Sequence, residues 1–213
     1  MQHRYDVTDP GQRDAGLAHA VSAARRGELI AVNVDGAYAL ITDAFSHAGV
    51  ERIRTLRARP TMNVPVLVPR AETVDGLAWL TGDSDLAART LMRDCWPGPL
   101  TLIARSQPSL PWACTPDGIV ALRMPMHPWT LDIVRTLGPT ATVPSNGPGQ
   151  PPHADVDEVW AALGDVVSVY LDGGPTLPDQ ASTIVDVSEP TPRITREGAF
   201  TREYLATLVE GLR

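Results

Sequence analysis

The sequence has 213 residues, of which 18 are basic and 25 acidic, so its formal net charge is −7. Hydrophobic residues make up 43% of it and charged residues 20%, which is typical of a globular protein. No apolar run reaches the roughly 20 residues of a membrane helix, and no apolar signal segment opens the chain. We therefore expect a cytoplasmic protein that makes no membrane contact.

Every basic residue is arginine, because the sequence contains no lysine. Arginine offers a planar fork of donors suited to phosphate and carboxylate groups. A Walker A phosphate-binding loop is excluded, since that motif needs a lysine. The acidic balance argues against a broad nucleic-acid surface but leaves a local basic site open. The two cysteines, Cys95 and Cys114, have no metal-binding spacing, so we predict reduced thiols and no metal site.

Helices and strands alternate through the first half of the chain. Asp9 is the expected N-cap of a helix that Pro10 begins, and Gln12 completes a capping box; Gly27 ends the pattern. Pro65 indicates the start of a strand or an edge strand. The expected elements after the first helix are a buried strand at 29–32, a helix through 50–56 that stops by Pro60, a strand at 64–68, and helices near 71–79 and 83–94.

The second half continues the alternation. It predicts strands at 100–103 and 119–122, a helix at 128–137, a strand at 140–143, a helix near 155–163, strands at 166–171 and 183–187, and a helix near 201–212. Interleaved helices and strands predict an α/β fold in one domain, residues 1–213. Residues 144–153, rich in Pro and Gly, are expected to line a site rather than to join two domains.

Several motifs follow one another in a fixed order along the chain. They are Arg57-Ala58-Arg59-Pro60, Trp96-Pro97-Gly98-Pro99-Leu100-Thr101, Leu122-Arg123-Met124-Pro125, Ser145-Asn146, Ser182-Thr183-Ile184-Val185-Asp186 and Arg196-Glu197-Gly198. In this order they resemble the YrdC family, the threonylcarbamoyl-AMP synthases. The resemblance covers about residues 13–200. It implies a twisted, mostly mixed or parallel sheet with flanking helices around a deep cleft.

The resemblance also implies a reaction. Family members use ATP, L-threonine and bicarbonate to make threonylcarbamoyl-AMP and pyrophosphate, for threonylcarbamoylation of tRNA adenosine 37. The expected partners are therefore these substrates, Mg²⁺ brought by ATP, tRNA and tRNA-modification proteins. Family members have also been described as binding double-stranded RNA. A carbamate and a triphosphate are both anionic, so the site needs fixed cations and hydrogen-bond donors.

Four residues are expected to bind nucleotide by this resemblance. Arg57 and Arg59 match the family's Lys-x-Arg, although Arg57 replaces the lysine. Asn146 matches the asparagine of a Ser-Ala-Asn-x-Ser-Gly loop, and Arg196 matches a C-terminal Arg-x-Gly. From the residues alone, the favoured interpretation of the arginines at 52–59 is a solvated face that complements the helix C-terminus.

Five residues are expected to bind the threonine or carbamate: Asp35, Tyr38, Arg123, Ser182 and Thr183. Arg123 is the expected carboxylate ligand, because it follows a strand and precedes Met-Pro as in the family. Ser182 and Thr183 begin a strand, where hydroxyls either bind a ligand or satisfy the strand end. No side chain is assigned a catalytic role.

The sequence departs from the family where substrate contacts are expected. Residues 33–40 read Asn-Val-Asp-Gly-Ala-Tyr-Ala-Leu in place of Pro-Thr-Asp-Thr-Val-Tyr-Gly-Leu. Val34 and Gly36 therefore lack the threonine hydroxyls. Pro144 and Pro148 replace two loop serines, and Ser145 is a candidate substitute.

Two functions follow from this pattern. The first is a synthase acting on ATP and threonine or another small amino acid. The second is a catalytically impaired or re-specified paralogue that binds nucleotide or double-stranded RNA in the same cleft. A carbamoyl-transfer domain of the hydrogenase-maturation type is disfavoured, because its acylphosphatase and zinc-finger modules are absent from the sequence.

Overall fold

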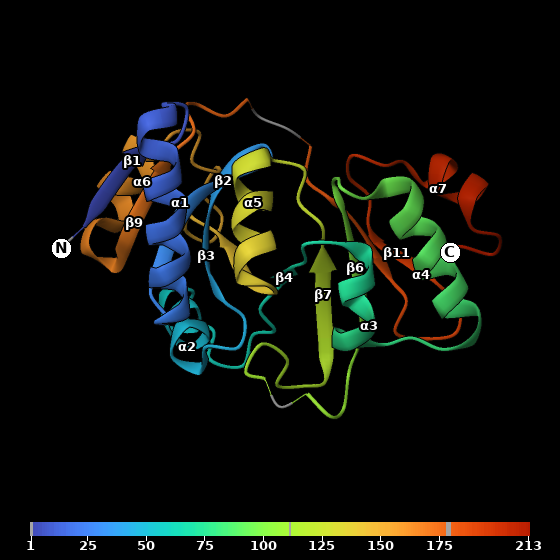
Figure 1. The fold of residues 1–213 in the computed structure, drawn as a ribbon. Helices are drawn as coiled ribbons and strands as arrows, with labels where there is room; N and C mark the ends of the chain where they lie inside the picture. The colour runs from blue at the N-terminus through green and yellow to red at the C-terminus, as the bar shows by residue number, and fades with distance from the viewer. Residues whose placement is uncertain (1, 111, 178–179) are drawn as a thin grey trace.

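The computed structural model describes residues 2–110, 112–177 and 180–213 (Figure 1). Its α-helices are α1 Pro10–Arg25, α2 His47–Leu56, α3 Val74–Leu77, α4 Gly82–Cys95, α5 Pro128–Leu137, α6 Val156–Leu163 and α7 Arg202–Leu208. Its strands are β1 His3–Asp6, β2 Leu29–Val34, β3 Ala37–Asp43, β4 Val66–Leu67, β5 Ala78–Trp79, β6 Leu100–Ser106, β7 Ile119–Arg123, β8 Thr140–Pro144, β9 Val167–Asp172, β10 Thr183–Asp186 and β11 Arg193–Arg196. Short 3-10 helices occupy Ala71–Thr73 and Gly164–Val166.

All of these strands belong to one sheet. The order is β1-β9-β2-β3-β8-β4-β7-β6-β10-β11, and β5 pairs with β6 beside this path. The pairs β1–β9, β2–β9, β4–β7 and β6–β10 are parallel, whereas the remaining pairs are antiparallel. The predicted α/β class with a mixed sheet and flanking helices is confirmed.

Helices cover both faces of the sheet, and each face has its own apolar core. Figure 1 shows α1 and α5 side by side in front of β2 and β3. Their Val21, Ile133 and Val134 pack against Ile30 and Val32 of β2. A larger cluster on the other face joins side chains of α2, α4, α6 and α7 to the sheet. The alternation of side chains along a strand therefore decides which core each residue of β2 meets.

The first helix begins as its sequence predicts. The Asp9 carboxylate accepts a hydrogen bond from the Gly11 backbone N–H at 2.9 Å, and Pro10 occupies the first turn. Gln12 differs from a standard capping box, because its Oε1 accepts from the Asp6 N–H at 3.2 Å and its Nε2 donates to the Asp9 carboxylate. Gly27, with φ of 75°, follows the helix end.

Two predicted elements have a different form. The expected helix at 71–79 is divided into a 3-10 turn, the four-residue α3 and the strand β5. The expected strand at 64–68 contains only two paired residues, and Pro65 does not mark an edge, since β4 lies between β8 and β7. Pro65 precedes the paired residues and contributes its carbonyl to Thr142 N–H at 2.9 Å. A proline can stand there because the ladder uses only its acceptor.

Among the described residues, the structure contains no helix that is both long and apolar enough to cross a membrane.

Candidate functional site

The turn between β2 and β3 brings Asp35 against the end of β7. Asp35 adopts φ of 57°, and its Oδ1 accepts backbone N–H bonds from Met126 at 2.9 Å and His127 at 2.8 Å. Its other oxygen forms an ion pair with Arg123. The Asp35 side chain is only 5% exposed. Two backbone donors and one guanidinium satisfy this buried carboxylate, so it fixes the start of α5.

Arg123 connects this turn to the loop before β6. Its Nε donates to the Gly98 carbonyl at 3.2 Å, while the Gly98 N–H donates to the Met124 carbonyl at 3.0 Å. A Cβ atom on Gly98 would lie 2.5 Å from the Cys95 carbonyl oxygen, so this close approach needs glycine. Arg123 is therefore held between a carboxylate and a carbonyl, with 19% of its side chain exposed.

Ser182 and Arg196 form a second group. The Arg196 guanidinium donates twice to the Ser182 carbonyl, from Nε at 3.0 Å and Nη2 at 2.8 Å, and Nη2 also reaches Ser182 Oγ at 2.9 Å. Ser182 Oγ lies 3.0 Å from Thr101 Oγ1 of β6. Thr101 belongs to the same motif as Gly98, so one segment joins the two groups.

Thr183 holds the turn that follows β11. Its Oγ1 donates to the Phe200 carbonyl at 2.7 Å and accepts from the N–H groups of Gly198 at 3.0 Å and Phe200 at 2.9 Å. Its side chain is fully buried. A Cβ atom on Gly198 would lie 2.1 Å from the Ala181 carbonyl oxygen, so glycine permits this packing. The ligand role predicted for Thr183 stays a prediction, because its hydroxyl already has three backbone partners.

Arg57 and Asn146 meet beside the end of β8. Arg57 is the C-cap of α2, and its guanidinium donates to the backbone carbonyl of Asn146. The Asn146 Nδ2 donates to the Gln150 carbonyl at 2.6 Å, whereas its Oδ1 is buried without a hydrogen-bond partner. Arg59 lies beyond the helix end and is exposed, with no hydrogen bond or ion pair from its side chain to the described residues.

Tyr38 lies inside the protein. Its hydroxyl donates to the Gly174 carbonyl at 2.9 Å and accepts from the Gly173 N–H at 3.1 Å, and burial raises its pKa to about 12. Ser145 is buried next to it and bonds the Tyr38 carbonyl at 2.8 Å and His153 Nδ1 at 2.9 Å. The Ser145 hydroxyl is thus already engaged, and its substitution for the serines missing at 144 and 148 stays a prediction.

The arginines of the site differ in how their charges are balanced. Arg123 has a carboxylate partner, whereas Arg57 and Arg196 contact neutral oxygens and have no acidic partner in the described part of the chain. A neutral oxygen orients a guanidinium without cancelling its charge. Arg57, Arg59 and Arg196 therefore retain the positive charge that an anionic ligand requires.

Val34 replaces a family threonine where a substrate contact was expected, but its side chain faces the protein core. Its half-buried side chain packs against the apolar core under α1 and α5. A threonine hydroxyl at this position would meet apolar groups, so valine is suited to the packing seen here.

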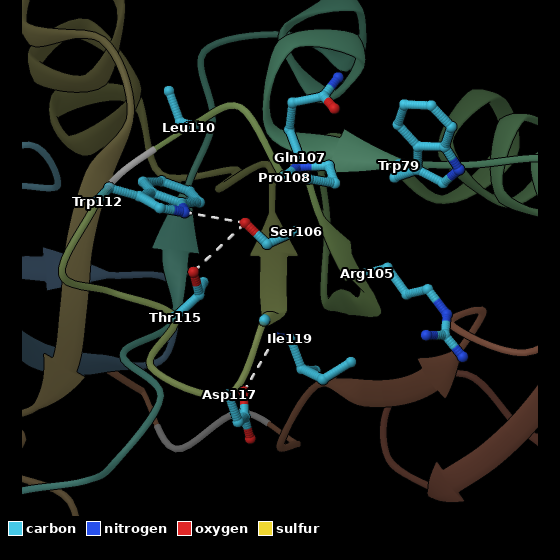
Figure 2. Close-up of a pocket in the computed structure, with 11 residues that line it drawn as sticks. Trp79, Arg105, Ser106, Gln107, Pro108, Leu110, Trp112, Thr115, Asp117 and Ile119 are labelled. Carbon is cyan, nitrogen blue, oxygen red and sulfur yellow. Dashed lines mark hydrogen bonds between the residues drawn. The ribbon is translucent and has the colours of Figure 1, made fainter.

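Two cavities lie away from these residues. One of about 620 Å³ opens beside Trp79, Trp112 and the end of β6, where Ser106 Oγ accepts from Trp112 Nε1 at 3.0 Å and from Thr115 at 3.3 Å (Figure 2). Another of about 730 Å³ lies between α2 and the strands β2 and β9. None of the nine predicted site residues lines either cavity. The predicted deep cleft therefore stays a prediction, and the site is defined by contacts.

No group of three or more His, Cys, Asp or Glu side chains among residues 2–110, 112–177 and 180–213 is placed to hold a metal ion.

Several residues of the site escaped the sequence analysis. His127 is the N-cap residue of α5, its Nδ1 is buried without a partner, and burial lowers its pKa. Thr130 donates to the Asn33 carbonyl. The only signal available was the position of His127 directly before the helix-initiating Pro128. A sequence pattern does not show that this segment packs on a turn about 90 residues away.

Comparison with known proteins finds relatives that match most of this chain. The family model of the Sua5, YciO and YrdC proteins, described as "Telomere recombination", matches residues 22–198. A putative threonylcarbamoyl-AMP synthase of Mycobacterium leprae is 41% identical over 98% of this chain and 94% of its own length. Its Mycobacterium tuberculosis counterpart is 38% identical over 98% and 96%. The Bacillus subtilis threonylcarbamoyl-AMP synthase is 32% identical over 96% of this chain and 60% of its own.

Solved structures share the fold. A doubly substituted Sua5 of Pyrococcus abyssi has a TM-score of 0.87 and 25% identity, covering 100% of this chain and 62% of its own. P. abyssi Sua5 complexed with L-threonine has a TM-score of 0.85 and 24% identity, covering 100% and 61%. Escherichia coli YciO has a TM-score of 0.79 and 21% identity, covering 96% and 98%. From the match over 22–198 and the near full-length relatives, the chain belongs to the Sua5/YciO/YrdC family.

Proposed function

We propose that this chain is an L-threonylcarbamoyladenylate synthase, which serves threonylcarbamoylation of tRNA adenosine 37. The amino group of threonine joins bicarbonate to give a carbamate and water. The carbamate carboxylate then attacks the α-phosphorus of ATP, and pyrophosphate leaves as the α–β phosphoanhydride bond breaks. The product would be passed to tRNA-modification proteins.

One observation supports this function most directly. Arg57 and Arg196 are positioned through neutral oxygens, so their charges are available to phosphate oxygens. Both reacting partners are anions, and fixed cations reduce the repulsion between them as they approach. The relatives named threonylcarbamoyl-AMP synthases support the same reaction.

A catalytically impaired or re-specified relative is the second candidate. It would bind nucleotide or double-stranded RNA at the same place. The commitment of Ser145 to Tyr38 and His153 favours it, because the loop then lacks the family's free hydroxyls. The changed 33–40 block favours re-specification.

The test is pyrophosphate release with ATP, Mg²⁺, bicarbonate and L-threonine, together with identification of the adenylate. Arg196→Ala should lower threonine-dependent release about a hundredfold, since it removes a fixed donor to developing charge. Arg193→Ala is the matched control on the same strand. The Arg193 guanidinium is exposed, lies 3.7 Å from the Asp186 carboxylate and is not a predicted ligand, so its loss should leave release unchanged. Threonine-independent ATP binding without pyrophosphate release in the unaltered protein would instead support the second candidate.

A further inference from the structure

The 620 Å³ cavity lies at the end of β6, apart from the residues of the proposed synthase site. Figure 2 shows Trp79 and Trp112 on either side of Ser106, the last residue of this strand. Thr101, which contacts Ser182, lies near the other end of β6, about 17 Å away along an extended strand. The cavity has the volume of a typical small-molecule pocket. It is therefore large enough to hold a ligand of its own.

Ser106 provides a hydrogen-bond donor without an acceptor in this cavity. The residue is 8% exposed, and its Oγ accepts from Trp112 Nε1 at 3.0 Å and from Thr115 Oγ1 at 3.3 Å. A hydroxyl group has two acceptor sites and one proton, so both acceptor sites are used and the proton remains. No residue in the described part of the chain accepts it. If Ser106 instead donates to Thr115, the Thr115 proton becomes the unpaired one.

This unpaired proton indicates a ligand that carries a hydrogen-bond acceptor. A buried donor without a partner is unfavourable, because it has lost its hydrogen bond to water and gained none in return. The bonds from Trp112 and Thr115 fix the position of the Ser106 oxygen before a ligand arrives. A carbonyl oxygen entering the cavity would supply the missing acceptor.

Two further residues of the lining have groups available to a ligand. The Trp79 side chain is 53% exposed, so a face of its indole is open to solvent beside the cavity. Gln107 follows Ser106 and is half-buried, and its carboxamide makes no hydrogen bond to a described residue. The indole can stack on a flat ring, and the carboxamide can bond an amide group.

The charged side chains of the lining balance one another. Arg105 forms an ion pair with Glu189 at 2.6 Å. Asp117 Oδ1 accepts from Asn63 Nδ2 at 2.6 Å and from the Ile119 N–H at 2.9 Å. One positive and one negative residue thus line the cavity, so its charge favours neither an anion nor a cation. A neutral ligand suits it best.

We propose that this cavity binds a small neutral aromatic amide, which stacks on Trp79 and accepts a hydrogen bond from Ser106 through its carbonyl oxygen. The amide N–H groups donate to the Gln107 carboxamide oxygen. Benzamide is the simplest molecule of this class, and nicotinamide and uracil carry the same carbonyl on other rings. The inference does not rest on the proposed synthase, because none of the predicted site residues lines the cavity.

The test is a titration of the full-length protein with benzamide, followed by the indole N–H signals in two-dimensional NMR. Benzamide should shift the signals of Trp79 and Trp112 in a saturable way. The signal of Trp160, which is 37% exposed but packs on Tyr170, should stay unchanged. Toluene has the ring without the acceptor and should bind about tenfold more weakly. Nicotinamide and uracil, titrated in parallel, distinguish a pyridine from a pyrimidine ring.

Two variants separate the contributions of the hydroxyl and the ring. Ser106→Ala should lower benzamide affinity about tenfold, to the level of toluene, and leave toluene affinity unchanged. Trp79→Ala should weaken both ligands about three- to tenfold, and its melting temperature should change little because the side chain is half exposed. Trp160→Ala is the matched control, an exposed tryptophan outside the cavity lining, and should leave both affinities unchanged.

Three results would overturn the inference. The first is the absence of a saturable shift at Trp79 and Trp112 with all three amides. The second is equal affinity for benzamide and toluene in the unaltered protein, which needs no variant and so holds even if Ser106→Ala fails to fold. The third is unchanged benzamide affinity in both Ser106→Ala and Trp79→Ala.

Discussion

The arginines between residues 52 and 59 have similar spacing but different roles. Arg54 is 5% exposed; its guanidinium bonds the Met62 carbonyl at 3.0 Å, the Ala113 carbonyl and the Glu51 carboxylate. Arg52 bonds the Gly27 carbonyl at 2.7 Å. Arg59 remains exposed. A solvated helix end was one interpretation of this segment, and burial shows that it does not hold for Arg54.

Replacing Arg54 by methionine should destabilise the fold by about 2–3 kcal/mol. The change leaves two buried carbonyls unpaired, while Glu51, which is 44% exposed, can return to water. Urea denaturation measures the difference. Arg59→Met should change the free energy of unfolding by less than about 0.5 kcal/mol. An equal loss in both variants would show that Arg54 is not the structural arginine of this segment.

The hydrogen-bond and ion-pair partners of each side chain were the least predictable feature of the site. Asp35 and Arg123 were both expected to bind substrate, and no pattern in the sequence indicates that they bind one another across 88 positions. The same is true of Tyr38, whose hydroxyl meets residues 135 and 136 positions away. Motifs identify the residue types that gather at a site. The distribution of hydrogen bonds among them depends on the sheet order, which local patterns do not encode.

Elements with a strong local signal were predicted well. α5 runs from Pro128 to Leu137 as expected, because Pro initiates it and Gly138, with φ of 96°, ends it. β1, β3, β5 and β11 were not predicted. β1, β5 and β11 are two to four residues long and are defined by pairing with a neighbour, so they carry too few residues for a periodic pattern. β3 has seven residues, but its five central residues are all buried, so its sequence lacks the alternation of a half-buried strand.

The start of β10 depends on one hydroxyl. Thr183→Val should destabilise the protein by about 2–3 kcal/mol, because the Gly198 and Phe200 N–H groups and the Phe200 carbonyl lose their buried partner while the shape is kept. Thermal and urea unfolding measure this. Thr195→Val on β11 is the control, since its exposed hydroxyl makes only a long bond of 3.4 Å. Equal stability of Thr183→Val and the unaltered protein would mean that the 198–200 turn is held by other contacts.

At the scale of the whole molecule, the single sheet collects residues from distant parts of the chain. Asp35 follows β2, Arg123 ends β7 and Ser182 precedes β10. Arg123 contacts both Asp35 and Gly98, and Ser182 contacts Thr101. Unneutralised arginines lie within a chain whose net charge is −7. The local positive charge can serve a small anion, whereas the overall field opposes a long polyanion.

Charge therefore distinguishes nucleotide binding from RNA binding. We expect ATP with Mg²⁺ to raise the melting temperature at 0.15 M salt, because arginines in direct contact with the phosphates would lie inside the Debye length of about 8 Å. Double-stranded RNA should show no measurable binding by fluorescence anisotropy under the same conditions. A protein that uses many phosphate contacts would gain RNA affinity steeply at lower salt, and the slope of log affinity against log salt would be close to the number of contacts.

The variants test which arginine binds ATP. Arg59→Ala should weaken the effect of ATP on the melting temperature, whereas replacing Arg202, an exposed arginine on α7, by alanine should not. RNA binding at 0.15 M salt that Arg59→Ala weakens would contradict the small-anion interpretation and favour a nucleic-acid site on this surface.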